Sequence, residues 1–256
     1  MDLTLTAIPA FQDNYIWLLA DGSIAAAIDP GDAEPVRRVL AERHLGLAAV
    51  LVTHHHADHI GGAAALAAEH ACPVFGPAGE AIEAVDTPLR EGMVADIPAL
   101  KARLRVLDIP GHTAGHIAYQ GHGIIFCGDT LFSAGCGRLF EGTAQQMYAS
   151  LAKLAMLPDD SLVCCGHEYT LANLRFAREV EPDNRDMKDY AEECAARRAL
   201  GEPTLPARLG RERKVNPFLR CGEYVVREAA RRRLRREPRD AVEVFAAIRE
   251  WKDGFS

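Results

Sequence analysis

One short stretch, residues 53–62 with the sequence Thr-His-His-His-Ala-Asp-His-Ile-Gly-Gly, constrains this chain more than any other. It places four of the ten histidines and one aspartate within residues 53–59. Imidazole and carboxylate groups are ligands for zinc, iron and manganese. The apolar run at residues 47–52, directly before it, predicts a buried strand. A polar loop with fortuitous histidines is the competing interpretation, and the dense spacing after a strand disfavours it.

The local geometry of this stretch predicts how its side chains divide. If the chain stays extended after the strand, His54 and His56 point to one side and His55 to the other. Asp58 then stands where a helix can begin, which is an N-cap position. We therefore expect His54 and His56 to bind one metal ion, while Asp58 and His59 face another.

The pattern Thr-His-x-His-x-Asp-His is the signature of the metallo-β-lactamase superfamily. From end to end, the chain resembles one family of that superfamily, glyoxalase II (hydroxyacylglutathione hydrolase). The resemblance implies an α/β fold, a four-layer αββα sandwich followed by a small all-α C-terminal domain. Strand patterns fade near residue 170, so we expect a metal-binding catalytic domain at residues 1–169 and a helical substrate-binding domain at residues 170–256.

Hydrophobic periodicity and turn residues predict the elements of both domains. The expected strands span residues 3–8, 15–19, 23–28, 47–52, 74–75, 103–109, 117–119, 124–127 and 162–165. The expected helices span residues 35–44, 59–70, 144–156, 171–180, 187–199, 224–236 and 241–251.

Three further motifs follow apolar runs, and each has a glycine just before its candidate ligand, which permits a sharp turn. They are Pro-Gly-His-Thr-Ala-Gly-His at residues 110–116, Gly-Asp-Thr at 128–130 and Gly-His-Glu-Tyr-Thr at 166–170. The resembled family carries ligands at these positions. By that resemblance, one metal site comprises His54, His56 and His112, a second comprises Asp58, His59 and His167, and Asp129 bridges the two. His116 is then expected to be a hydrogen-bonding partner outside the ligand set.

The resemblance also implies a mechanism. Two divalent ions, zinc first and iron or manganese as alternatives, would share a hydroxide that attacks a thioester carbonyl. Asp58 and Asp129 could accept the proton of the water or orient it. Because the metals activate water, Ser133 and Cys136 are expected to be loop residues and not nucleophiles.

The resemblance assigns five glutathione contacts outside the metal motifs: Arg138, Phe140, Tyr169, Arg249 and Lys252. Many family members have Lys and Tyr at the first two positions; Arg138 keeps the charge, whereas Phe140 lacks the hydroxyl. The basic pair Arg249 and Lys252 would face the glycine carboxylate of glutathione. The competing interpretation of this pair is a solvated last helical turn that favours the helix dipole. Residues 13–15 and 216–220 also match the family, and we assign them no chemistry.

Composition excludes several other classes of protein. Apolar residues make up 48% of the chain and charged residues 25%, as in ordinary globular proteins. No apolar run approaches the ~20 residues that span a bilayer, and the start lacks the basic region of a signal peptide. Seven scattered cysteines are typical of buried thiols in a reducing compartment. We therefore expect a cytoplasmic protein without a membrane partner.

The net charge of −7 is unevenly distributed. Residues 201–256 carry 14 Lys and Arg against 9 Asp and Glu, whereas the rest of the chain has an excess of acidic residues. The arginines at residues 231–236 could suggest nucleic acid, but a solvated helix face explains them and an acidic body repels a polyanion. We expect no nucleic-acid partner, and a positive potential toward a small anionic substrate instead.

The expected function is hydrolysis of S-(2-hydroxyacyl)glutathione, as S-D-lactoylglutathione, to glutathione and D-lactate in methylglyoxal detoxification. A glutathione-persulfide dioxygenase with one iron, another hydrolase of the same fold and a non-catalytic metal-binding scaffold are the alternatives. The appended helical segment with its basic pair favours the thioester hydrolase. The residues leave the oligomeric state open, and a monomer is the expectation.

Overall fold

The computed structural model describes residues 3–255, and their contacts divide into two compact units. The first unit contains the described residues up to 108 together with residues 113–128 and 164–167. The second contains residues 109–112, 129–163 and the described residues from 168 onward. The two units are therefore interleaved along the chain, and the domain boundary between residues 169 and 170 stays a prediction.

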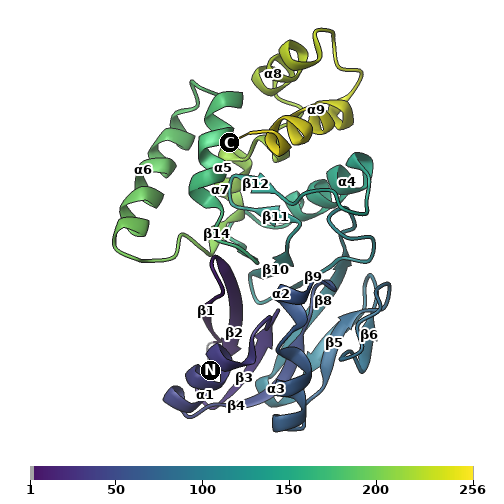
Figure 1. Cartoon of the computed structure of the whole chain (residues 1–256), viewed down its shortest axis with the longest axis vertical. Helices are drawn as coiled ribbons and strands as arrows, with labels where there is room; N and C mark the ends of the chain where they lie inside the picture. Colours follow the sequence, from purple (N-terminus) through teal and green to yellow (C-terminus); the bar gives the residue numbers. More distant parts are fainter. Residues whose placement is uncertain (1–2, 256) are drawn as a thin grey trace. The chain divides into compact units, whose positions relative to one another are not determined.

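The first unit is built on a six-stranded sheet with its strands in sequence order (Figure 1). Strands β1 to β3 run antiparallel, whereas β3 to β6 run parallel. The strands are β1 (Thr4–Ala10), β2 (Asn14–Ala20), β3 (Ile24–Ile28), β4 (Gly46–Leu51), β5 (Val74–Pro77) and β6 (Thr87–Leu89). Every residue of β2 is buried, as its largely apolar sequence Asn-Tyr-Ile-Trp-Leu-Leu-Ala requires.

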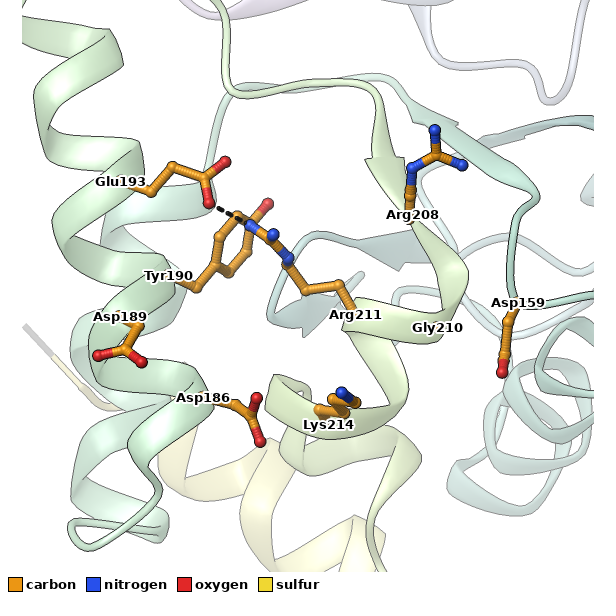
Figure 2. A pocket seen from close by; sticks show the side chains of 9 residues that line it. All are labelled: Asp159, Asp186, Asp189, Tyr190, Glu193, Arg208, Gly210, Arg211 and Lys214. Carbon is orange, nitrogen blue, oxygen red and sulfur yellow. Dashed lines mark hydrogen bonds and ion pairs between the residues drawn. The ribbon is translucent and has the colours of Figure 1, made fainter.

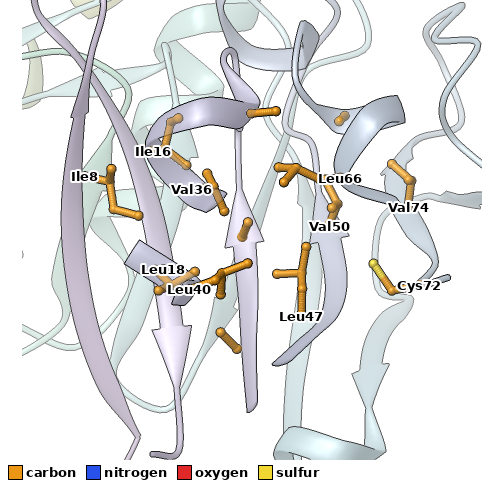
Figure 3. Close-up of a cluster of buried hydrophobic side chains, with 14 of the residues drawn as sticks. Ile8, Ile16, Leu18, Val36, Leu40, Leu47, Val50, Leu66, Cys72 and Val74 are labelled. Atoms are coloured by element: carbon orange, nitrogen blue, oxygen red, sulfur yellow. The ribbon is translucent and has the colours of Figure 1, made fainter. Parts of the chain in front are cut away.

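Three helices accompany this sheet: α1 (Ala33–Arg43), α2 (Ala57–Ile60) and α3 (Ala63–His70). Asp32 caps α1 by accepting a hydrogen bond from the backbone N–H of Glu34, as N-cap residues do. The helices bury the residues that recur at helical spacing, among them Val36, Leu40 and Leu66. These side chains pack with Ile16 and Leu18 of β2 and with the other members of one core cluster (Figure 3).

The structure corrects two expectations around the ligand loop. The single helix predicted at residues 59–70 is broken at Gly61 and Gly62. A Cβ on Gly62 would lie 2.5 Å from the backbone N of Ala33, so the close approach of two backbones requires glycine there. Asp58 does not cap a helix, because His56 occupies the N-cap position and Asp58 lies inside the first turn of α2.

The first unit also holds the antiparallel strands β7 (Val94–Ile97), β8 (Ala102–Asp108), β9 (Ile117–Gly121) and β10 (Ile124–Gly128), with the 3-10 turn η1 (Pro98–Leu100) between β7 and β8. His122 and Gly123, both with positive φ, form the tight turn between β9 and β10. The last residues of β13 (Leu162–Cys165) lie beside β10, where the Cys127 thiol donates to the Cys164 carbonyl. The ends of these strands therefore bring residues 116, 128 and 166–167 close together. The Gly166 N–H donates to the Gly128 carbonyl oxygen, and a Cβ on Gly128 would contact the His116 ring.

The second unit is mostly helical. It contains a two-stranded hairpin, β11 (Leu131–Phe132) and β12 (Gly135–Cys136), and the first two residues of β13 paired antiparallel with β14 (Ala207–Arg208). Its helices are α4 (Ala144–Ala155), α5 (Thr170–Val180), α6 (Arg185–Ala199), α7 (Leu209–Val215), α8 (Tyr224–Leu234) and α9 (Ala241–Asp253), with the 3-10 turn η2 (Pro217–Leu219) after α7. A capping box between Thr143 and Gln146 begins α4.

Two groups of packed side chains lie in the second unit. One contains Leu174, Met187 and Val215 together with Ala134 of the hairpin turn. The other is aromatic, with the Phe176 ring 5.3 Å from Trp251 and 6.1 Å from Phe218. Aromatic pairs at this separation contribute about 0.5–1.5 kcal/mol beyond their buried area.

The elements that sequence patterns did not predict are short or charged. Strands β6, β7, β11, β12 and β14 span two to four residues each, too few for alternation to register. Helix α7, with the sequence Leu-Gly-Arg-Glu-Arg-Lys-Val, has two strongly apolar residues in seven. All seven cysteines are buried and none forms a disulfide, as expected of structural thiols. Within residues 3–255, no helix combines the length and apolar character needed to cross a bilayer.

Candidate metal centre

His54 and His56 lie in the extended segment that follows β4. The Thr53 hydroxyl donates to Asp29 Oδ2 (2.8 Å), and the Thr53 N–H donates to Asp29 Oδ1 (2.7 Å). Because the hydroxyl proton goes to Asp29, Thr53 Oγ1 accepts from His54 Nδ1 at 3.1 Å. This leaves the lone pair of His54 on Nε2, which lies 3.1 Å from His56 Nδ1. The two nitrogens are therefore presented side by side.

His55 and His116 take different positions around this pair. His55 Nδ1 lies 2.9 Å from a Glu80 carboxylate oxygen, so its ring is held by a separate partner. The buried His116 ring stacks on His54 with centroids 4.6 Å apart, and its Nδ1 lies 3.1 Å from the Ile117 carbonyl oxygen. The role of His116 outside the ligand set stays a prediction.

Asp58, His59 and His167 form a second group in the first unit. One ligand atom from each lies within 4.8 Å of the others. Asp58 Oδ2 is 3.7 Å from His59 Nε2 and 3.4 Å from His167 Nε2. Both imidazoles are buried, whereas Asp58 is partly exposed. Two nitrogen donors and one carboxylate at this spacing suit a divalent first-row ion.

Three side chains to which the sequence analysis assigns no chemistry contact the members of this group. Asp13 Oδ1 lies 2.8 Å from His167 Nδ1, and Asn14 Nδ2 donates to Asp58 Oδ2 at 2.9 Å. Asp29 Oδ2 lies 3.2 Å from His59 Nδ1. Carboxylates on the outer nitrogen of a metal-binding histidine fix its tautomer and raise its basicity. The only sequence signal for Asp13 and Asn14 was that residues 13–15 match the family.

The charge state of Asp58 follows from these contacts. Burial raises the pKa of its carboxyl, but the hydrogen bond from Asn14 and the nearby His59 and His167 lower it further than burial raises it. The pKa of Asp58 is therefore below its ordinary value of 3.8. At neutral pH the group is a carboxylate that can bind a cation or accept a proton.

His112 and Asp129 lie in the second unit, close to each other and buried. His112 Nδ1 donates to the Arg138 carbonyl oxygen at 2.9 Å, so its lone pair is on Nε2. That nitrogen lies 3.5 Å from Asp129 Oδ2. A Cβ on Gly137 would lie 1.9 Å from the Asp129 carbonyl oxygen, so the segment that leads to Arg138 packs directly on the backbone of Asp129.

Three of the expected glutathione contacts lie near His112 or the hairpin within the second unit. The Phe140 ring is 62% exposed and lies 5.2 Å from the His112 ring. Arg138 Nε lies 3.5 Å from Asp253 Oδ1. The Tyr169 ring is 5.2 Å from Phe132.

The competing interpretation of a solvated helix end is wrong for Arg249, the buried member of the basic pair on α9. Arg249 is 5% exposed and donates to the Cys136 carbonyl oxygen (2.7 Å) and to Asp253 (3.0 Å). Lys252 is half-buried, with its ammonium 5.5 Å from the Phe176 ring centroid. Burial lowers the pKa of Lys252, and the neighbouring Arg249, Arg175 and Arg138 lower it further. These residues concentrate positive charge on one part of the second unit.

A surface pocket of about 510 Å³ lies elsewhere in the second unit, between α6 and α7 (Figure 2). Acidic side chains such as Asp186 and Asp189 come from α6, and basic ones such as Arg211 and Lys214 come from α7. None of the expected ligands or glutathione contacts lines this pocket.

Comparison with known proteins decides the family. Residues 11–167 match the family model described as the metallo-beta-lactamase superfamily, and residues 168–255 match that of the hydroxyacylglutathione hydrolase C-terminus. The hydroxyacylglutathione hydrolase of Alkalilimnicola ehrlichii is 55% identical over 251 residues, which cover 97% of this chain and 98% of that protein. The chain belongs to the hydroxyacylglutathione hydrolase family. The family predicted from the ligand motifs is confirmed.

Solved structures support the fold of this family member. ETHE1 from Myxococcus xanthus aligns with a TM-score of 0.67 and 25% identity, covering 98% of this chain and 91% of that one. TTHA1623 in a di-iron-bound form aligns with a TM-score of 0.59 and 26% identity, covering 84% and 100% respectively. The predicted α/β metallo-β-lactamase fold with a C-terminal helical region is confirmed. The fold and its histidine and aspartate clusters support binding of divalent metal.

Proposed function

We propose that this chain hydrolyses S-(2-hydroxyacyl)glutathione to glutathione and a 2-hydroxy acid, with S-D-lactoylglutathione and D-lactate as the expected pair in methylglyoxal detoxification. The observation that carries the proposal is the full-length relationship to hydroxyacylglutathione hydrolases. Both the segment with the ligand residues and the helical segment after it match that family. The fold alone would not select the substrate, because one fold hosts many activities.

We propose a binuclear centre on the donor groups described above. One divalent ion would be held by His54, His56 and His112, a second by Asp58, His59 and His167, with Asp129 as the ligand common to both. Zinc is the first expectation, and iron and manganese accept the same nitrogen and oxygen donors. When bound, such ions polarise a carbonyl oxygen and lower the pKa of water toward neutrality.

Side chains of the protein contribute to this reaction by accepting a proton and by orienting other groups. Asp58 is ionised at neutral pH and can accept or orient a proton of the attacking water, as can Asp129. Asp13 contacts His167 Nδ1 and Asn14 donates to Asp58, and these hydrogen bonds hold both groups in fixed orientations, which removes reorganisation from the reaction.

A covalent route through Ser or Cys finds no support here. Burial raises the pKa of the Cys136 thiol to about 11, so it is not a thiolate at neutral pH. The buried Ser133 hydroxyl donates to the Glu212 carboxylate at 2.7 Å. Water is therefore the expected nucleophile.

The glutathione moiety is proposed to contact Arg138, Phe140, Tyr169, Arg249 and Lys252. Phe140 offers an exposed apolar ring, and the cationic groups near Asp253 offer the opposite charge to the glutathione carboxylates. Because Arg249 already donates to Cys136 and Asp253, Lys252 is the more available direct partner.

The test measures thiol release from S-D-lactoylglutathione by purified protein, with metal analysis of the same sample. The proposal expects thiol release by protein that holds two ions per chain. Oxygen uptake with glutathione persulfide, measured in parallel, should be absent. Metal-loaded protein that releases no thiol, or that consumes oxygen with the persulfide, would contradict the proposal.

A further inference from the structure

The short hairpin of β11 and β12 joins two residues of the proposed site. Asp129 stands two residues before its first strand, and Arg138 stands two residues after its second. Each strand has only two residues, and isolated two-stranded hairpins are at best marginally stable. Ala134, in the turn, adopts a left-handed conformation with φ of 53°, which is unfavourable for a residue with a Cβ. The position of this hairpin must therefore be fixed by other parts of the chain.

Side chains from the C-terminal helical segment bind the backbone of this hairpin. Asn216, the residue that ends α7, donates through Nδ2 to the carbonyl oxygens of Phe132 (3.1 Å) and Gly135 (2.9 Å). Asn173 of α5 donates to the Ser133 carbonyl oxygen at 3.0 Å. Together with the Arg249 contact to Cys136, these bonds engage the carbonyl groups of residues 132, 133, 135 and 136.

Glu212 of α7 is the acceptor at the centre of this network, and its side chain is fully buried. Its carboxylate accepts from the Ser133 hydroxyl (2.7 Å), the Ala134 N–H (2.7 Å) and Asn216 Nδ2 (3.1 Å). All three partners act as donors, so the geometry suits an ionised carboxylate, which only accepts. A buried network that is fully satisfied fixes a single arrangement of its members.

The network continues to the surface of the second unit. Because the Ser133 hydroxyl donates to Glu212, it accepts from the Tyr190 hydroxyl at 2.9 Å. The Tyr190 ring lies under the Arg211 guanidinium, 4.6 Å from its central carbon, and Arg211 pairs with Glu193 at 2.5 Å (Figure 2). These side chains cover the network on the side of the pocket between α6 and α7.

We propose that Glu212, together with Asn216, is a positioning residue for the metal centre and for glutathione, acting through the hairpin. The inference rests on the proposed function. Gly137 N donates to Thr130 O at 3.2 Å, and Gly137 packs against the Asp129 carbonyl. A shift of the hairpin therefore moves the backbone that holds Asp129, and also the Arg138 carbonyl that orients His112. The helical segment then sets the geometry of ligand residues that precede it in the chain by some 80 to 100 positions.

The experiment compares Glu212→Gln with a matched control, Glu181→Gln. Glu181 is also a buried carboxylate of the helical segment, but its side chain pairs with Arg220, at 2.8 and 3.0 Å. The purified zinc-loaded full chain of each variant is titrated against a chelator to obtain the dissociation constant of zinc. KM and kcat for S-D-lactoylglutathione and the thermal unfolding midpoint are measured on the same preparations.

We expect Glu212→Gln to weaken zinc binding by roughly tenfold, at the low end of the ~10–100-fold range typical of outer partners of metal ligands, and to raise KM. Glu181→Gln should lower the unfolding midpoint yet leave the zinc affinity and KM unchanged. Unchanged zinc affinity in Glu212→Gln, or equal losses in the two variants, would overturn the proposal and leave Glu212 with a stabilising role only.

Ser133→Ala keeps the test informative if Glu212→Gln fails to fold. It removes one of the three hydrogen bonds to Glu212 and should shift zinc affinity in the same direction by a smaller factor. No shift in Ser133→Ala would then count against the proposal. Because the zinc titration does not need turnover, a wild-type protein that binds zinc and fails to cleave the thioester would contradict the proposed function without deciding the role of Glu212.

Discussion

At the scale of single residues, three of the candidate ligands are imidazoles whose outer nitrogen already has a partner. Asp13 holds Nδ1 of His167, the Arg138 carbonyl holds Nδ1 of His112, and Thr53 holds Nδ1 of His54. Each contact leaves the lone pair on Nε2, the nitrogen that faces other candidate ligands. These contacts fix the tautomers that leave Nε2 available to a metal ion.

The contact between Asp13 and His167 gives the first prediction. Asp13→Ala should weaken metal binding by roughly 10–100-fold, because His167 loses the partner that fixes its ring. Asp13→Asn keeps an oxygen that can accept from Nδ1 and should lose less. Chelator titration of zinc-loaded protein measures both variants. If Asp13→Ala binds zinc as tightly as the wild type, the side chain does not support the site.

The two histidines of residues 110–116 give the second prediction. His112→Ala should reduce the zinc content of purified protein far more than His116→Ala, because His112 is proposed as a ligand and His116 as an outer partner. The expected cost of removing an outer partner is ~10–100-fold in affinity. Metal analysis of both variants after dialysis provides the measurement. Equal or reversed losses would show that the assignment of the two residues is wrong.

At the scale of elements, helix α9 makes a buried contact that its sequence does not indicate. Arg249 and Lys252 lie three residues apart on this helix, as predicted, but Arg249 is buried against the β12 carbonyl at Cys136. Periodicity placed both residues on one face. It could not reveal the hydrogen bond, because the partner lies 113 residues earlier in the chain.

A third prediction separates the two basic residues. Lys252→Ala should raise KM for the glutathione thioester by roughly tenfold or more, since a charge-assisted hydrogen bond contributes about 1.5–3 kcal/mol. Because the proposed contact is with a glutathione carboxylate, remote from the reacting carbonyl, kcat should be unchanged. Arg249→Ala should raise KM similarly and also lower the unfolding midpoint. Steady-state kinetics and thermal unfolding test this, and an unchanged KM in both variants would remove the pair from the glutathione site.

The fourth prediction concerns helix α7. Burial raises the pKa of Glu212 from 4.5 to about 7, although hydrogen bonds from Ala134, Ser133 and Asn216 oppose this. A raised folded-state pKa means that the folded protein binds the proton more tightly than the unfolded chain. Protonation of Glu212 therefore stabilises the folded protein most below pH 4.5, and this stabilisation is lost as the pH rises through about 7, above which the ionised carboxylate that the three donors fit prevails.

Urea unfolding at pH 5 and pH 8 tests this linkage. The free energy of unfolding of the wild type, relative to Glu212→Gln, should fall across this range by up to roughly 3 kcal/mol, at 1.36 kcal/mol per pH unit. Arg211 and Tyr190, the other titratable groups near Glu212, keep their charge state between these two pH values. A difference that is independent of pH would show that Glu212 does not titrate in this range.

At the scale of the whole molecule, the sequence predicts those parts of the site whose residues all lie within one short motif. The spacing of residues 53–59 indicates a metal-binding loop because its donors are neighbours in sequence. The contacts of Asp13 with His167 and of Glu212 with Ala134 span 154 and 78 residues, and no local pattern encodes them. The helix break at Gly61 and Gly62 likewise depends on a close approach to residues 30–33.

Asp129→Ala tests the proposed binuclear centre most directly, because one carboxylate is proposed to serve both ions. Zinc content per chain and thiol release from S-D-lactoylglutathione are measured on the same wild-type and variant preparations. A centre bridged by Asp129 should give two ions and rapid release in the wild type. The variant should lose close to two ions, and its rate should be lower by several orders of magnitude, given how far metal coordination lowers the pKa of water. A variant that keeps two ions and near-normal turnover would show that Asp129 does not bridge the two ions.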